Sequence, residues 1–118
     1  MRKPALPAVI GLALCLCAPV AGALTPAEAT QHIGESATVC GTVAGAHYAR
    51  ATEGQPTFVN LDQPYPNQVF TIVVWGDYRG KFQTPPETWT GHLCATGKIS
   101  AYRGKVEMKV FGPQQIRH

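Results

Sequence analysis

The chain has 118 residues, a formal net charge of +3 and only 14% charged residues. This length suits one ordinary domain and excludes a second, and the weak basic balance weakens any argument for nucleic-acid binding from bulk charge alone. The sequence contains no internal repeat, low-complexity tract or run of like charges.

The first residues have the composition of an export signal. Arg2 and Lys3 form a charged start, residues 5–20 are mostly apolar, and residues 21–23 give the small-x-small pattern of a signal-peptidase site. The apolar run is short for a membrane span, which needs roughly 20 residues. We therefore expect a signal peptide over residues 1–23, no membrane insertion after its removal, and one domain over residues 24–118 in a periplasmic or secreted protein.

Two of the four cysteines, Cys40 and Cys94, lie outside this signal, and loss of Arg2 and Lys3 would lower the net charge from +3 to +1. In an oxidising compartment an even pair of cysteines predicts a disulfide, and two buried free thiols are the alternative. Closing a loop of about 55 residues would stabilise the fold by roughly 4 kcal/mol through chain entropy.

A short helix is predicted at the start of the domain, over residues 25–32. Thr25 suits a cap, Pro26 suits the first helical position, and Glu28 completes a capping box with Thr25. Gly34 is expected to end the helix.

Five segments have the composition of β-strands, at residues 39–44, 57–61, 69–75, 92–100 and 106–111. The third is β-branched and aromatic almost throughout, so we expect it to be the most buried. Polar segments with glycine, proline or asparagine predict turns at residues 47–55, 62–67 and 102–105. Residues 76–82 predict a short helical turn, which Pro85 and Pro86 stop, and Asp77, Arg79 and Lys81 are expected to make it a charged, exposed surface turn.

This order of elements predicts an all-β fold. It is the order of a small five-stranded OB-type Greek-key barrel with a short N-terminal helix and a short helical insert between strands three and four. In such a barrel the first strand pairs with the fourth. Cys40 and Cys94 lie near the middle of those strands, and neighbouring strands about 4.8 Å apart allow a disulfide, so the fold and the disulfide support each other.

Six short sequence motifs carry a resemblance to known proteins: HIGE at residues 32–35, ATVCGTV at 37–43, PTFVNLD at 56–62, YPNQ at 65–68, CATGKI at 94–99 and YRG at 102–104. Together they resemble a group of bacterial exported OB-fold proteins, over nearly all of the domain. The resemblance implies an OB fold and a nucleic-acid-binding module.

A more distant similarity is to the anticodon-binding OB domain of class II aminoacyl-tRNA synthetases. Phe58 resembles the stacking phenylalanine of the second strand in that domain, and Gln68 the glutamine that begins its third strand. Residues 62–66 depart from the short charged turn of the synthetase module. Because an exported protein does not meet anticodons, the similarity implies geometry only.

An OB groove is formed by strands two and three together with the loops after strands one and four. Aromatic faces and cations in such a groove hold single-stranded nucleic acid. The residues that map to it are Tyr48, Arg50, Phe58, Asn60, Gln68, Tyr102, Arg103 and Lys105. The alternatives are a core position for Phe58, merely solvated hairpin residues, and plain loop roles for Tyr48 and Arg50.

Catalysis and metal binding find little support. The histidines His32, His47, His92 and His118 have no metal-ligand spacing, and Glu53 and Asp62 lack a third acid or basic pair. We expect no catalytic residue, no metal and no cofactor, and therefore no enzyme.

The sequence thus predicts a monomeric, exported OB-fold binding module, with single-stranded DNA or RNA as its leading partner. One alternative is a periplasmic envelope or stress protein whose barrel binds a small molecule or a partner protein. Another is an accessory module of a separate nuclease. The same fold serves all three.

Overall fold

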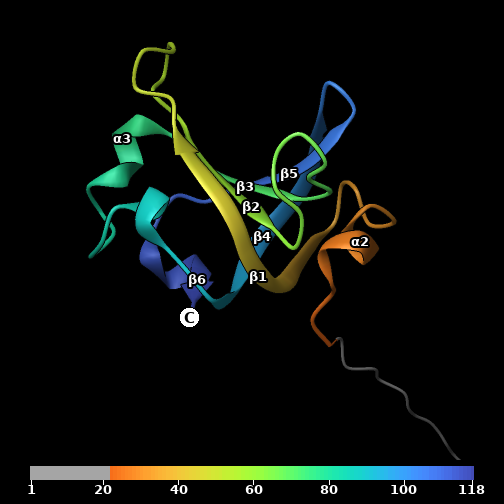
Figure 1. The fold of residues 1–118 in the computed structure, drawn as a ribbon. Helices are drawn as coiled ribbons and strands as arrows, with labels where there is room; N and C mark the ends of the chain where they lie inside the picture. The colour runs from red at the N-terminus through yellow and green to blue at the C-terminus, as the bar shows by residue number, and fades with distance from the viewer. Residues whose placement is uncertain (1–21) are drawn as a thin grey trace, which may run out of the picture.

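The computed structural model describes residues 22–118. The expected signal peptide lies outside these residues except for its last two positions. Figure 1 shows mainly β-structure, with α2 and the α3 insert at opposite sides of the strands. Among residues 22–118 no helix is long and apolar enough to cross a membrane.

The strands are β1 Ser36–Tyr48, β2 Thr57–Leu61, β3 Thr71–Val74, β4 His92–Tyr102, β5 Lys105–Lys109 and β6 Ile116–Arg117. The helices are α2 Pro26–Ala29 and α3 Gly76–Arg79, with 3₁₀ turns η2 Pro86–Thr88 and η3 Pro113–Gln115. The expected all-β class is confirmed. The second strand has the expected bounds, β1 and β4 are longer than expected, and β6 was not expected.

The strands form one six-stranded sheet in the order β1-β2-β3-β5-β4-β6, and β1 also pairs with β4. All of these pairings are antiparallel except the parallel pairing of β3 with β5. Residues 36–42 of β1 pair with β4, and residues 43–48 pair with β2. The register shifts between Val43 and Gly45, a bulge that bends β1 from one partner strand to the other (Figure 1).

The expected disulfide is confirmed. Cys40 and Cys94 lie directly opposite each other in the β1–β4 pairing and are bonded. The bond joins two strands whose cysteines are 54 positions apart in the sequence. Disulfides of this kind are typical of proteins in oxidising compartments.

Each strand directs alternate side chains into a common core, and in β3 the residues of the outer face are buried as well. The largest fully buried side chains of this core are apolar: Val39, Val59, Leu61, Phe70, Ile72, Val74, Leu93, Ile99, Met108 and Val110. All four residues of β3 are buried, which confirms that the third strand is the most buried. Ala29 of α2 joins this core at one end.

Two local predictions are confirmed at the chain's turns. Thr25 and Glu28 form the capping box of α2, although the helix ends at Ala29 rather than near residue 32. Between β4 and β5, Arg103 and Gly104 have φ of 51° and 81°. Two successive residues with positive φ form the tight hairpin turn that matches the twist of the strands.

Candidate functional site

Alternation along β2 separates a core face from an outer face. Thr57, Val59 and Leu61 are fully buried, whereas Phe58 is only partly buried and lies outside the apolar core cluster. Phe58 therefore belongs to the outer face, as does Asn60 two residues further along. The alternative that Phe58 fills the core is therefore wrong.

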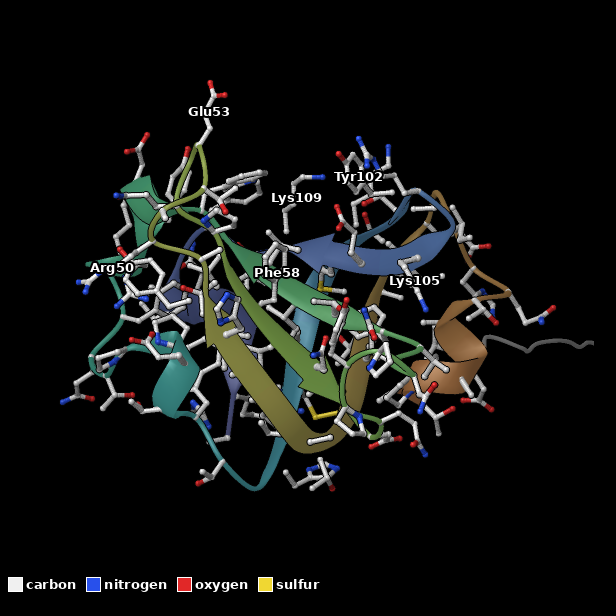
Figure 2. The ribbon with its side chains drawn as sticks, turned by 45° about the horizontal axis from the view of Figure 1, so that its top comes forward. Arg50, Glu53, Phe58, Tyr102, Lys105 and Lys109 are labelled. Atoms are coloured by element: carbon white, nitrogen blue, oxygen red, sulfur yellow. A yellow bond between two sulfur atoms is a disulfide. The ribbon has the colours of Figure 1, made fainter. Side chains whose placement is uncertain are left out.

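Strand register places the outer residues in rows across the sheet. Phe58 lies between His47 of β1 and Val73 of β3, and Val73 is in turn beside Lys109 of β5. The next row joins Asn60, Thr71 and Glu107. Figure 2 shows Phe58, Tyr102, Lys105 and Lys109 along the same side of the strands.

These rows form the floor of a hollow with a volume of about 540 Å³. Its lining residues come from β1, β2, β3, β5, the β2–β3 loop and the β4–β5 hairpin: His47, Phe58, Asn60, Tyr65, Gln68, Thr71, Tyr102, Arg103, Lys105 and Glu107. Six of the eight residues that the sequence predicts for a groove therefore meet here. The two that do not are Tyr48 and Arg50.

Three aromatic side chains surround the hollow. Tyr65 is 77% exposed and Tyr102 is 60% exposed, while Phe58 is partly covered within the sheet. Large aromatic groups are usually covered when they have only a structural role, so two strongly exposed tyrosines beside one hollow form a notable apolar surface. Exposed rings can stack on a flat ligand, and the guanidinium carbon of Arg103 lies 5.4 Å from the Tyr102 ring centroid.

The charges around the hollow are mixed, with cations in excess. Arg103 and Lys105 are exposed at the hairpin, and Lys105 Nζ lies 3.5 Å from the carbonyl oxygen of Pro66 in the opposite loop. Glu107 is mostly buried in the floor, where Lys109 Nζ lies 3.0 Å from Glu107 Oε2. The pairing neutralises the one carboxylate of the lining, so Arg103 and Lys105 determine its net charge.

Polar groups in the floor differ in how they are satisfied. Thr71 Oγ1 donates a hydrogen bond of 2.7 Å to Asn60 Oδ1. Gln68 Oε1 is buried and accepts no hydrogen bond from the described residues. A buried acceptor without a donor costs free energy.

Tyr48 and Arg50 lie at another part of the molecule, near the α3 insert. The guanidinium carbon of Arg79 lies 3.6 Å from the ring centroid of Tyr48, and that of Arg50 lies 5.5 Å from it. Because Arg79 covers the Tyr48 ring, Tyr48 has a packing role. Figure 2 shows Arg50 and Glu53 projecting from the β1–β2 loop, away from Phe58 and Lys105.

Arg79 itself is held by a network that the sequence did not reveal. Arg79 Nη1 donates to Glu87 Oε1 at 2.6 Å and to Thr57 Oγ1 at 2.9 Å, and Nη2 donates to Glu87 Oε2 at 3.2 Å. The hydrogen bond between the two side chains lowers the pKa of Glu87 and raises the pKa of Arg79. The expected exposed surface turn is thus wrong for Arg79, which ties α3 to η2 and β2.

Two further hollows do not combine rings with lysine or arginine. One, of about 460 Å³, lies around Phe82, Trp89 and His118, and the other, of about 410 Å³, lies around Trp75 and Tyr78. Neither lining contains a lysine or arginine. Over residues 22–118, the His, Cys, Asp and Glu side chains form no group of three or more that could hold a metal ion.

The sequence matches no protein-family model, and no curated protein is significantly similar to it. The site is therefore interpreted from its own geometry.

Sequence reasoning missed four residues of the lining: His47, Tyr65, Thr71 and Glu107. Thr71 and Glu107 follow from the register, since they share a row with Asn60. Tyr65 lies in a proline-bearing loop, where no periodic pattern assigns a direction to a side chain. An aromatic residue inside a predicted turn was the available signal.

Proposed function

We propose that this chain is an OB-type module that binds single-stranded nucleic acid in the hollow beside Phe58. The strand pairing supports the OB-type barrel, because it links β1 to β2, β3, β5 and β4 in turn and then returns from β4 to β1. In OB folds the ligand face consists of strands two and three beside the loops after strands one and four. The hollow occupies the outer face of strands two and three next to the β4–β5 hairpin, and the β2–β3 loop lines it in place of the loop after strand one.

One observation carries the proposal: three aromatic side chains and two exposed cations, from three separate segments, line one hollow. Single strands expose both base faces and phosphates. Stacking on Phe58, Tyr65 and Tyr102 is favourable for any base, while Arg103 and Lys105 neutralise phosphates. Neither of the other hollows offers both kinds of group.

The acidic side chain in the floor is compatible with this ligand. Glu107 is paired with Lys109 and lies beside Thr71, whereas Arg103 and Lys105 lie at the rim. Bases would occupy the floor and phosphates the rim. The carboxylate therefore faces the hydrogen-bonding edges of bases rather than the phosphates.

The proposed setting is the periplasm or the extracellular space. The disulfide between Cys40 and Cys94 supports an oxidising compartment, and the composition of residues 1–23 supports export. Nucleic acid in this setting would be extracellular DNA or RNA, or their fragments.

The size of the hollow favours one alternative. A volume of about 540 Å³ lies within the range of about 300 to 1,000 Å³ that small-molecule sites occupy. A flat aromatic metabolite would use the same stacking groups without needing the cations. Dependence of affinity on Arg103 and Lys105 separates the two ligand classes.

The test is fluorescence-anisotropy binding of labelled single-stranded DNA and RNA to three proteins: wild type, Phe58→Ala and Ile33→Ala. Ile33 is the matched control, because it is an exposed apolar side chain outside the hollow. We expect Phe58→Ala to weaken binding by about 1 to 3 kcal/mol, which is typical of one stacked base. Ile33→Ala should bind like wild type.

Two results would contradict the proposal. Equal affinity of wild type and Phe58→Ala would remove the hollow as the binding site. A loss of folding stability of about 3 to 5 kcal/mol in Phe58→Ala would assign that ring to the core instead.

A further inference from the structure

Outer residues continue along β5 beyond the hollow. In β5, Val106 and Met108 are buried, whereas Lys105, Glu107 and Lys109 are at least partly exposed. Val110 N donates a hydrogen bond of 3.0 Å to Val73 O, so the pairing with β3 extends past the end of β5. Val110 is fully buried, and the alternation therefore places Phe111 on the same outer face as Lys109.

Phe111 belongs to a second aromatic group with its own cation. Its ring is 44% exposed and meets the Tyr78 ring edge to face, with centroids 5.1 Å apart. Lys81 Nζ lies 5.6 Å from the Tyr78 ring centroid. Figure 2 shows Lys105 and Lys109 spread along β5, and Phe111 follows Lys109 two residues further along the chain.

We propose that a bound single strand continues from the hollow along β5 to a second stacking platform formed by Phe111 and Tyr78, with Lys81 beside the platform neutralising a phosphate. This inference rests on the proposed function. It extends that function by defining a direction for the strand and a second site.

The groups along this path fit the proposal. A lysine lies beside the platform, and an aromatic ring is exposed where a base could stack. Two acidic side chains lie near this path: Asp77 of the same insert is exposed, and the charge of Glu107 is compensated by Lys109. The backbone of Phe111 is fixed, because its N–H donates to Gln115 Oε1 at 2.7 Å. The edge-to-face contact with Tyr78 orients the ring before any ligand arrives, which lowers the entropic cost of stacking.

The test compares two probe lengths, fluorescein-labelled oligothymidylates of about 4 and about 12 nucleotides, the range of site sizes for one OB fold. A short probe fits the hollow alone, and a long probe reaches the platform. We expect Phe111→Ala to weaken binding of the long probe about 5-fold or more and to leave the short probe unchanged. Phe58→Ala should weaken both.

A second variant guards against a folding defect in Phe111→Ala. Lys81 is exposed, so Lys81→Ala should fold normally, and Lys98→Ala, which removes an exposed lysine of β4, is its control. Loss of one phosphate contact should make the slope of log affinity against log salt shallower by about 0.7 for the long probe only. Lys98→Ala should leave that slope unchanged.

Each outcome has one meaning. The second platform would be overturned if Phe111→Ala and Lys81→Ala bound the long probe like wild type while Phe58→Ala bound it weakly. The proposed function would then still stand. The second platform would also be overturned if Phe111→Ala lost affinity equally for both probes and melted at a lower temperature while Lys81→Ala bound normally. Phe111 would then have a structural role. Absence of binding by wild type to either probe would overturn the proposed function itself.

Discussion

Removal of the Arg79 side chain tests the network that holds the α3 insert to the sheet. Arg79 donates three hydrogen bonds, two to Glu87 and one to Thr57, and its guanidinium covers the Tyr48 ring at 3.6 Å. The Arg79 and Glu87 side chains are only 19% and 29% exposed, so water screens their attraction incompletely. Thr57 is fully buried, and Arg79→Ala would leave its hydroxyl without this donor.

The magnitude follows from these contacts. Hydrogen bonds to a charged group contribute about 1.5 to 3 kcal/mol each, and a cation–π contact about 0.5 to 2 kcal/mol. The contributions are not additive because one side chain makes all of them, and partial exposure reduces them further. We expect Arg79→Ala to lower the free energy of unfolding by about 3 kcal/mol.

Urea denaturation followed by circular dichroism measures this change, with Lys98→Ala as the matched control for loss of an exposed cation. A double-mutant cycle with Glu87→Ala isolates the coupling between the two side chains. A loss of less than about 1 kcal/mol, similar to that of an ordinary surface ion pair, would refute the reasoning.

Three further predictions concern pH, redox state and the hairpin. The pKa of Glu87 lies below its usual value of 4.5, so the carboxylate stabilises the fold above that pH, and this stabilisation is lost as the pH falls through the pKa of the folded state. The difference in unfolding free energy between wild type and Glu87→Gln, measured by urea titration, should therefore narrow below about pH 4.5. A difference that widens there would contradict the prediction. Replacing both Cys40 and Cys94 by serine should lower the free energy of unfolding by about 4 kcal/mol, and an unchanged urea midpoint would be inconsistent with a formed disulfide. Replacing both Arg103 and Lys105 by alanine should change stability by only about 0 to 1 kcal/mol, because both side chains are exposed; a large fall in melting temperature would make them structural.

Local patterns in the sequence predicted a large part of this fold. Thr25 and Glu28 identified the cap of α2, period-two alternation identified β2, and Gly104 identified the hairpin turn. Each of these signals lies within a few residues of the feature it specifies. The disulfide was predicted from an even pair of cysteines in an expected oxidising compartment, and the expected pairing of the first and fourth strands supported it.

Features that depend on distant contacts were not predictable in the same way. Arg79 looked like a solvated surface residue because its partners, Thr57 and Glu87, belong to other elements. The last strand, β6, has two residues and pairs only with Cys94 and Ala95. Two residues are too few to show a periodic pattern in the sequence.

In the candidate site, too, local patterns predicted some residues, and distant contacts determined the others. Phe58 and Asn60 share a strand and a face, so alternation alone placed them together. Tyr48 ends β1 in another row, and its ring is covered by Arg79, a contact that alternation does not reveal. Tyr65 enters the site from a loop whose path depends on the whole fold.

The salt dependence of single-strand binding tests the central claim most directly. Arg103 and Lys105 line the hollow and Lys81 lies beside the second platform, which implies two or three phosphate contacts. Anisotropy titrations of labelled single-stranded oligonucleotides at several salt concentrations should therefore give binding at low salt and a shallow slope of about −1.4 to −2.1 in log affinity against log salt. Absence of binding at low salt, or an affinity that does not change with salt, would contradict the claim that this hollow holds single-stranded nucleic acid.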